Sequence, residues 1–163
     1  YGNMIIAFME DGNLYHESIK VPEEIRFLAM VPDFELSTEK ARAVLPKEIP
    51  HKHGVFNVSR CALLIAAFTK NNLDLVKAAC KDKFHQDYRS HLINNYDDIV
   101  AYANSLDSLG TFLSGAGPTI MTLAKDGDNE ILYKMKSYLA ALPDNWQILD
   151  LHCDPNGAYY KEV

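Results

Sequence analysis

The last third of the sequence restricts the fold more than any other part, because short apolar runs alternate there with a single helix-like run. After Gly110, a short strand, a glycine-containing turn and a second strand at 119–124 are followed by a helical pattern at 129–142 and a final strand at 147–153. Strand, helix and strand in this order are typical of a split β-α-β layer. We therefore predict an α+β fold, with a ferredoxin-like antiparallel sheet and helices packed on one face of it.

The first thirty residues predict a hairpin and one more strand. Strand-like runs at 4–9 and 14–21 flank Asp11 and Gly12. Both of these residues tolerate the positive φ of a tight turn, so an Asp-Gly step between two such runs is a strong hairpin signal. A further strand is expected at 26–31.

Helices are predicted for the middle of the chain. Ser37 or Thr38 is expected to cap a first helix, because Ser and Thr side chains accept hydrogen bonds from the free amides of a helix start. Apolar spacing of three and four residues then predicts further helices at 55–69, 73–83 and 95–107.

Length and charge limit the classes of protein to which the chain can belong. A chain of 163 residues, 48% of them apolar, is long enough for one domain with its own core. The 22 acidic residues outnumber the 16 basic ones, and the formal net charge is −6. We therefore expect no nucleic-acid partner, because a phosphate backbone requires a positive field over a whole face. We also expect no membrane partner, since no run approaches the roughly 20 apolar residues of a bilayer span. No secretory leader is expected, because the sequence does not open with a basic stretch followed by an apolar one.

The cysteines and histidines favour a cytoplasmic protein without a metal site. Cys61, Cys80 and Cys153 lie far apart and form no Cys-x-x-Cys pair, so neither a disulfide framework nor a thiolate zinc site is predicted. His51 and His53 are interpreted as part of a polar loop, because no carboxylate or third histidine lies nearby at ligand spacing.

A glycine turn is the most distinctive local motif. It runs over residues 113–119, where Gly115 and Gly117 flank an alanine. Two such glycines let the backbone approach an anion closely and direct consecutive amides at it. The alternative is an ordinary tight turn, because the sequence lacks a complete phosphate-loop pattern.

Two further segments contain groups that suit a small amino-acid substrate. If the segment after Lys81 is helical, one side of that helix holds Asp82, His85, Gln86 and Arg89. That side either binds a zwitterion or is a solvated, self-paired polar face. Thr38 and Arg42, four residues apart, suit a carboxylate, because a guanidinium grips it with two prongs. The alternative there is a capping Thr and a surface Arg.

Read together, four segments resemble one family. The first is 31–46, which contains a Thr-x-x-x-Ala-Arg-x-x-Leu-Pro pattern, and the second is 55–60. The third is 85–89, which reads His-Gln-x-Tyr-Arg, and the fourth is the glycine turn. Their order and spacing resemble the C-terminal half of the homoserine kinases, which belong to the GHMP small-molecule kinases. The glycine turn alone indicates only the superfamily, and the other patterns narrow the resemblance.

The resemblance implies an enzyme that transfers the γ-phosphoryl group of ATP to the hydroxyl of L-homoserine, with Mg²⁺, in threonine biosynthesis. It implies that Arg42 and Arg89 hold the substrate carboxylate, with Thr38 beside the first of them. Asn57 and His85 match other substrate-binding positions. No catalytic base is identified by the resemblance. The turn residues implied to support the phosphate loop are Ser114, Gly115, Ala116 and Gly117.

The departures from the family are equally informative. The Pro-x-x-x-Gly-Leu-Gly-Ser-Ser-Ala type of loop that wraps ATP, and the acidic residues that hold magnesium, are not found in this sequence. The chain also opens at Tyr1 without an initiator Met. We therefore expect residues 1–163 to be a GHMP kinase C-terminal domain without the N-terminal ATP-binding domain, and we expect this fragment to be inactive alone. Exposed sheet edges would allow it to associate as a homodimer.

Two alternatives remain open at this stage. One is a stand-alone regulatory module that senses an amino acid through Arg42 and Arg89, because the fold alone does not define the function. The other is a sibling GHMP kinase with a different substrate. A sugar or mevalonate has less use for two arginines around an α-carboxylate, which favours homoserine.

Overall fold

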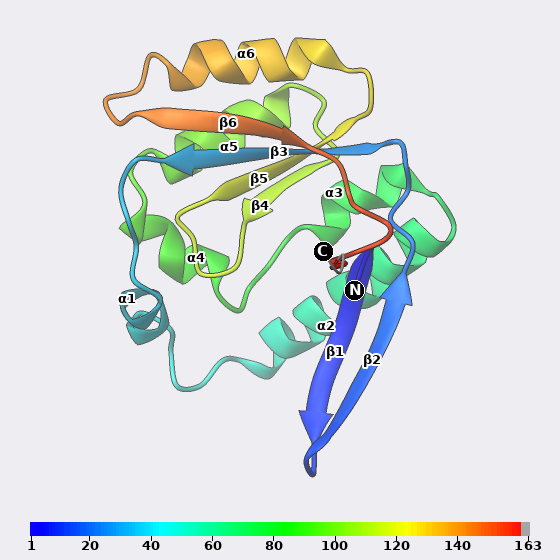
Figure 1. Ribbon diagram of the computed structural model, residues 1–163. Coiled ribbons are helices and arrows are strands. Elements are labelled where there is room, and N and C mark those ends of the chain that lie inside the picture. Colours follow the sequence, from blue (N-terminus) through cyan, green and yellow to red (C-terminus); the bar gives the residue numbers. More distant parts are fainter. Residues whose placement is uncertain (161–163) are drawn as a thin grey trace.

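The fold is built on a four-stranded antiparallel sheet. The computed structural model describes residues 1–160. Strands β3 (Ile25–Pro32), β4 (Gly110–Leu113), β5 (Ile120–Lys125) and β6 (Trp146–Leu151) lie in the order β4-β5-β3-β6 (Figure 1). With helices between β3 and β4 and between β5 and β6, this is the predicted ferredoxin-like arrangement. The α+β fold class is confirmed.

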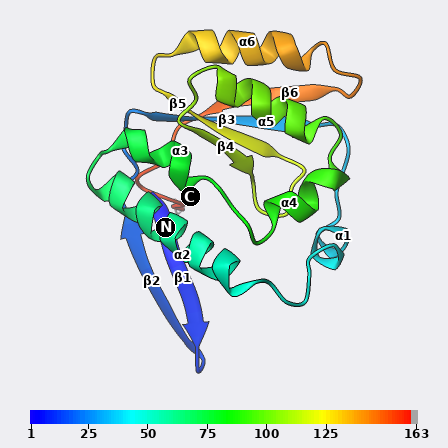
Figure 2. The same cartoon turned by 180° about the vertical axis from the view of Figure 1, so that it is seen from behind.

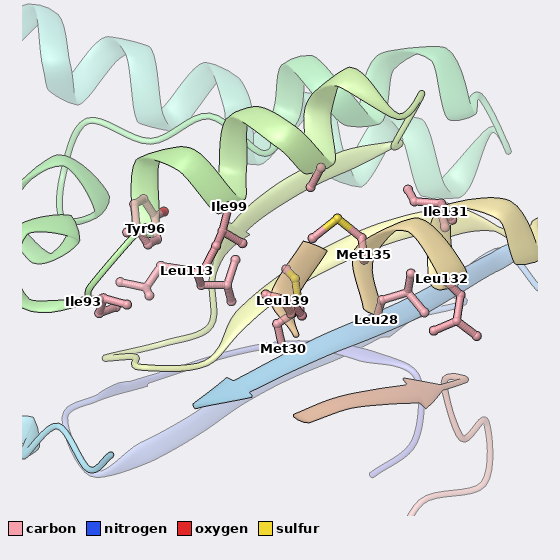
Figure 3. Close-up of a cluster of buried hydrophobic side chains, with 13 residues drawn as sticks. Leu28, Met30, Ile93, Tyr96, Ile99, Leu113, Ile131, Leu132, Met135 and Leu139 are labelled. Carbon is pink, nitrogen blue, oxygen red and sulfur yellow. The ribbon is translucent and has the colours of Figure 1, made fainter. Parts of the chain in front are cut away.

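The main core lies between one face of the sheet and two helices. Helices α5 (Tyr96–Ser105) and α6 (Asn129–Leu139) run across that face (Figures 1 and 3). Side chains alternate along a strand, so Leu28 and Met30 of β3 point to the same face, and both are fully buried there. They pack in one cluster with Ile99 of α5 and Met135 of α6.

A second, smaller cluster lies on the other face of the sheet. It contains Ile25 of β3 and Leu123 of β5, together with Phe68 from the end of α2 (His51–Thr69) and Val76 of α3 (Val76–Ala79). The sheet is therefore packed against α5 and α6 on one side, and against the end of α2 and α3 at one end of the other side.

Two helical predictions need correction. Helix α2 begins at His51, so His51 and His53 lie in its first turn and not in a loop. Proline is well suited to a helix start, and Pro50 precedes this one. The helix expected at 73–83 is also wrong.

The segment 73–83 forms a 3₁₀ turn, η1 (Leu73–Leu75), and the short helix α3, which ends at Ala79. Helix α4 (Gln86–Arg89) and the 3₁₀ turn η2 (Ser90–Leu92) follow only after an irregular stretch. Within 73–83, the Lys83 amide donates to Oδ1 of Asn57 and not to a helical carbonyl. The Asp82 carboxylate then accepts the amides of residues 84–86 at the start of α4.

The hairpin is confirmed and stands apart from the main sheet. Strands β1 (Met4–Glu10) and β2 (Asn13–Ile19) pair with each other alone and project from the body of the protein (Figures 1 and 2). Asp11 and Gly12 form the turn with φ of 49° and 78°. Phe8 and Tyr15 stack across the hairpin with ring centroids 5.0 Å apart, and both remain exposed. In residues 1–160, no helix has the length and apolar character to cross a bilayer.

Candidate substrate site

Arg89 joins three segments that the sequence singled out separately. It is the last residue of α4. Its Nε donates to the carbonyl of Ala41 in α1 (Thr38–Ala43) at 2.9 Å, and its Nη1 donates to the carbonyl of Gly115 at 2.9 Å. Charge-assisted bonds of this kind are roughly twice as strong as neutral ones. The guanidinium therefore fixes α1 and the glycine turn relative to α4.

His85 precedes α4 and lies beside the Arg89 guanidinium. Its Nδ1 accepts from Arg89 Nη1 at 3.3 Å, which leaves the ring proton of the neutral form on Nε2. Nε2 is 3.9 Å from Oδ1 of Asp82. Burial lowers the pKa of His85, the Asp82 carboxylate raises it and Arg89 lowers it again, and the net shift is downward. His85 is therefore neutral near pH 7 and serves here as a hydrogen-bonding group.

Helix α1 presents Thr38 and Arg42 to solvent. Ser37 caps this helix, since its hydroxyl accepts from the Lys40 amide at 3.1 Å, so of the two predicted caps Ser37 is the one used. Both Thr38 and Arg42 are exposed. Among residues 1–160, no hydrogen-bond or ion-pair partner is found for the Arg42 guanidinium, so the full fork of this side chain is free for a carboxylate.

The Asn57 side chain is not free, because it is hydrogen-bonded to Asp82 and Lys83. Its Nδ2 donates to Oδ1 of Asp82 at 2.6 Å, and its Oδ1 accepts from the Lys83 amide at 2.8 Å. Asn57 lies within α2, so these bonds attach the irregular segment before α4 to that helix. Substrate binding by Asn57 stays a prediction, and the structure adds this second role.

Asp82, His85, Gln86 and Arg89 do not lie on one side of a single helix, so that prediction is wrong. Only Gln86 and Arg89 are in α4, while Asp82 lies before it. Sequence reasoning missed the role of Gln86, whose Oε1 accepts from Tyr96 and from the Leu113 amide. These contacts bridge 10 and 27 residues, and no local pattern marks them.

The glycine turn combines left-handed backbone with amides that are unpaired within residues 1–160, and these are two features of an anion-binding nest. Ser114 donates its amide to Thr119 and Gly117 donates its amide to Ser114, which closes the turn. Gly115 and Gly117 have φ of 58° and 85°. Within the described part of the chain, the amides of Gly115 and Ala116 have no hydrogen-bond partner, so two consecutive donors remain available.

The two glycines are expected to differ in their tolerance of alanine. A Cβ at Gly115 meets no heavy atom within 4 Å, whereas a Cβ at Gly117 lies 3.1 Å from Cδ1 of both Ile93 and Leu113. Left-handed backbone costs an L-residue about 1–2 kcal/mol, and overpacking adds about 1–3 kcal/mol. Gly117→Ala should therefore lower the free energy of unfolding in urea by more than Gly115→Ala. Equal losses would show that the crowding at Gly117 is relieved without cost.

A hollow of about 500 Å³ lies beside this site. Its lining comes from the β3–α1 connection, including Ser37 and Lys40, and from Pro118 and Thr119 after the glycine turn. The described residues contain no cluster of three or more His, Cys, Asp or Glu that could hold a metal ion. The structure brings Arg89, a neutral His85 and the glycine turn together, with Arg42 exposed on the adjoining helix α1. Binding of an anionic group by these residues stays a prediction.

Comparison with known proteins gives the class first. Residues 64–141 match the family model described as "GHMP kinases C terminal", and this range includes α4 and the glycine turn. This part of the chain is therefore similar to the C-terminal domain of the GHMP kinases.

Curated proteins that are similar to the chain include homoserine kinases. The chain is 47% identical over 156 residues to homoserine kinase of Clostridium botulinum, covering 96% of this chain and 52% of that protein. It is 43% identical over 157 residues to homoserine kinase of Clostridium beijerinckii, covering 96% of this chain and 53% of that protein. The chain therefore spans about half the length of the curated relatives it matches.

Solved structures agree with the fold. The crystal structure of homoserine kinase from Cytophaga hutchinsonii aligns with a TM-score of 0.88 at 25% identity, over 95% of this chain and 50% of that one. Mevalonate kinase of L. major, solved with R-mevalonate, aligns with a TM-score of 0.72 at 20% identity, over 97% of this chain and 51% of that one. The second likeness shows the shared fold alone.

Proposed function

We propose that this chain is the substrate-binding half of an ATP-dependent homoserine kinase. The full protein transfers the γ-phosphoryl group of ATP to the side-chain hydroxyl of L-homoserine, a step of threonine biosynthesis. Identity of 47% to a homoserine kinase over 96% of the chain supports this proposal. The observation that carries it is the position of the Arg89 guanidinium, which bonds to both Ala41 and Gly115 and so brings α1 and the glycine turn together.

The substrate carboxylate is bound by Arg42 and Arg89 in this proposal. Arg42 offers its whole fork, and Arg89 offers Nη2, since Nε and Nη1 already donate to the protein. Thr38, at the start of the same helix as Arg42, donates one more hydrogen bond. The two cations orient the amino acid, and phosphoryl transfer depends chiefly on positioning and on stabilising charge.

ATP and Mg²⁺ are bound mainly by residues outside this chain. The chain covers 52% of the homoserine kinase of Clostridium botulinum, so the other half of such a protein is available to bind them. The free amides of Gly115 and Ala116 support a role for the glycine turn beside the phosphate-binding loop. We place the protein in the cytoplasm, since Cys61, Cys80 and Cys153 are free thiols, as is usual in a reducing compartment.

The proposal predicts a difference between the chain alone and the full-length protein. The full-length protein should phosphorylate L-homoserine with ATP and Mg²⁺, and the 163-residue chain alone should show no turnover. A coupled assay of ADP release measures both, with R-mevalonate and galactose as competing substrates. Turnover by the chain alone would refute the proposal that ATP and Mg²⁺ are bound mainly by residues outside it. A full-length protein that prefers mevalonate or galactose would refute L-homoserine as the substrate.

A further inference from the structure

Asp82 has a role in the site that neither the motifs nor the family resemblance assigns. One of its oxygens, Oδ2, accepts three backbone amides, those of Phe84 at 3.0 Å, His85 at 2.7 Å and Gln86 at 2.7 Å. Helix α4 has only four residues. A helix of that length has no stability of its own, so its position must come from bonds to the rest of the protein.

The second oxygen of Asp82 attaches this segment to a long helix. Oδ1 accepts from Nδ2 of Asn57 at 2.6 Å, and the Oδ1 of Asn57 accepts from the Lys83 amide at 2.8 Å. Asn57 lies in the 19-residue helix α2. The Asp82–Asn57 pair therefore holds the start of α4 against a rigid element.

Gln86, the first residue of α4, attaches that helix to the rest of the protein at a second point. Its Oε1 accepts from the Tyr96 hydroxyl at 3.0 Å and from the Leu113 amide at 2.9 Å. Leu113 is the last residue of β4 and the first residue of the glycine turn. Gln86 therefore bonds to Asp82 through its backbone amide and to β4 through its side chain.

One helical turn later, Arg89 receives its position from these bonds. In Figure 1, α4 lies between α1 and the turn that joins β4 to β5, and Arg89 donates to both. We propose that Asp82, through Asn57 and the amides of His85 and Gln86, is a positioning residue that holds His85 and Arg89 in the substrate site. This inference rests on the proposed function, because the site it positions is that of the kinase.

The charge state of Asp82 agrees with this role. Burial raises the pKa of Asp82, but the backbone amides of residues 84–86 and the Asn57 side chain lower it by more, so the net shift is downward. A lowered pKa in the folded state means that the stabilisation is present above the pKa of an unfolded aspartate. It is lost as the pH falls through the lower, folded value. Near pH 7 the carboxylate is charged and all of its bonds persist.

The pair offers a test by exchange of partners. Both carboxylate oxygens of Asp82 accept hydrogen bonds, whereas the side chain in Asp82→Asn has one accepting oxygen. Either the backbone amides of residues 84–86 or the Asn57 side chain must therefore lose its acceptor. Asn57→Asp places two carboxylates in contact, where the present donor and acceptor are 2.6 Å apart. The double variant Asn57→Asp/Asp82→Asn restores every bond. The amide then at position 82 can accept the backbone amides and donate to the carboxylate at position 57, whose other oxygen accepts the Lys83 amide. The total charge is unchanged.

In the full-length protein, each single variant should raise KM for L-homoserine about tenfold or more, with KM for ATP nearly unchanged, since bonds to a charged group are lost. The double variant should return KM for L-homoserine to within about threefold of the wild type. Asp87→Asn is the matched control, because it breaks only the exposed ion pair with Lys83 in the same segment. It should leave both constants unchanged.

Hydrogen exchange provides a readout that does not depend on activity. In the single variants, the amides of Phe84, His85 and Gln86 and the Nε–H of Arg89 should exchange faster, and the double variant should restore their protection. If homoserine KM stays at the wild-type value in Asp82→Asn, or if the double variant remains as impaired as the single ones, the positioning role is refuted. A wild-type protein without homoserine kinase activity refutes the proposed function, and Arg89 Nε–H exchange then decides the positioning role by itself.

Discussion

Replacing Arg89 by alanine in the full-length protein is expected to raise KM for L-homoserine by about 10- to 150-fold, with little change in KM for ATP. A hydrogen bond to a charged group contributes about 1.5–3 kcal/mol, and each 1.4 kcal/mol is a factor of ten. The variant also loses the bonds to Ala41 and Gly115 that hold α1 and the glycine turn in place. Steady-state kinetics with each substrate varied in turn measure the effect.

Two controls separate substrate binding from structural support. Arg89→Lys keeps the charge but not the forked donor geometry, so its KM should lie between those of the wild type and Arg89→Ala. Arg60→Ala removes a guanidinium that packs over the Phe56 ring, 4.4 Å from its centroid, and should leave both constants near the wild-type values. Equal increases in KM for homoserine and ATP in Arg89→Ala would identify Arg89 as a structural residue only.

The largest loss of stability is expected from Leu28→Ala. Leu28 is fully buried on β3, which lies between β5 and β6 in the sheet. In Figure 3 it faces the core cluster formed with α5 and α6. Leucine-to-alanine changes at such sites cost about 2–5 kcal/mol, because a cavity remains beside the lost contacts. Urea unfolding of the variant and the wild type should show this difference.

A leucine of the hairpin provides the matched control. Leu14 on β2 is 52% exposed, and its truncation to alanine should change the free energy of unfolding by about 0.5 kcal/mol or less. If Leu28→Ala costs no more than Leu14→Ala, the cluster of Leu28, Ile99 and Met135 is not the main core of the protein.

The sheet could be predicted from the sequence because its signals are local. The predicted strand at 26–31 lies within β3, and the strand predicted at 147–153 overlaps β6. Pro32 ends β3, and the unbroken apolar run at 27–31 is typical of a strand that is buried on both faces. The helix expected at 73–83 ends instead at Ala79, and the Lys83 amide, which would close its last turn, donates to the Asn57 side chain.

The candidate site could be predicted only in part. Arg42, Arg89 and the glycine turn were found through motif patterns, and the structure shows that Arg89 brings α1 and that turn together. The contacts of Asp82 with Asn57 and of Gln86 with Leu113 join residues 25 and 27 positions apart. Contacts over such separations depend on how the helices pack, so spacing along the chain does not reveal them.

The projecting hairpin has a consequence for how the protein opens. Only Met4 and Ile19, at its base, pack against a core cluster, while Phe8, Met9 and Leu14 stay exposed. Few buried contacts mean a low free energy of local unfolding, so β1 and β2 form a separate cooperative unit from β3 and β5. In the 163-residue chain taken alone, β3 and β5 therefore keep their protection while the hairpin frays, and a protease would cut first at the turn formed by Asp11 and Gly12.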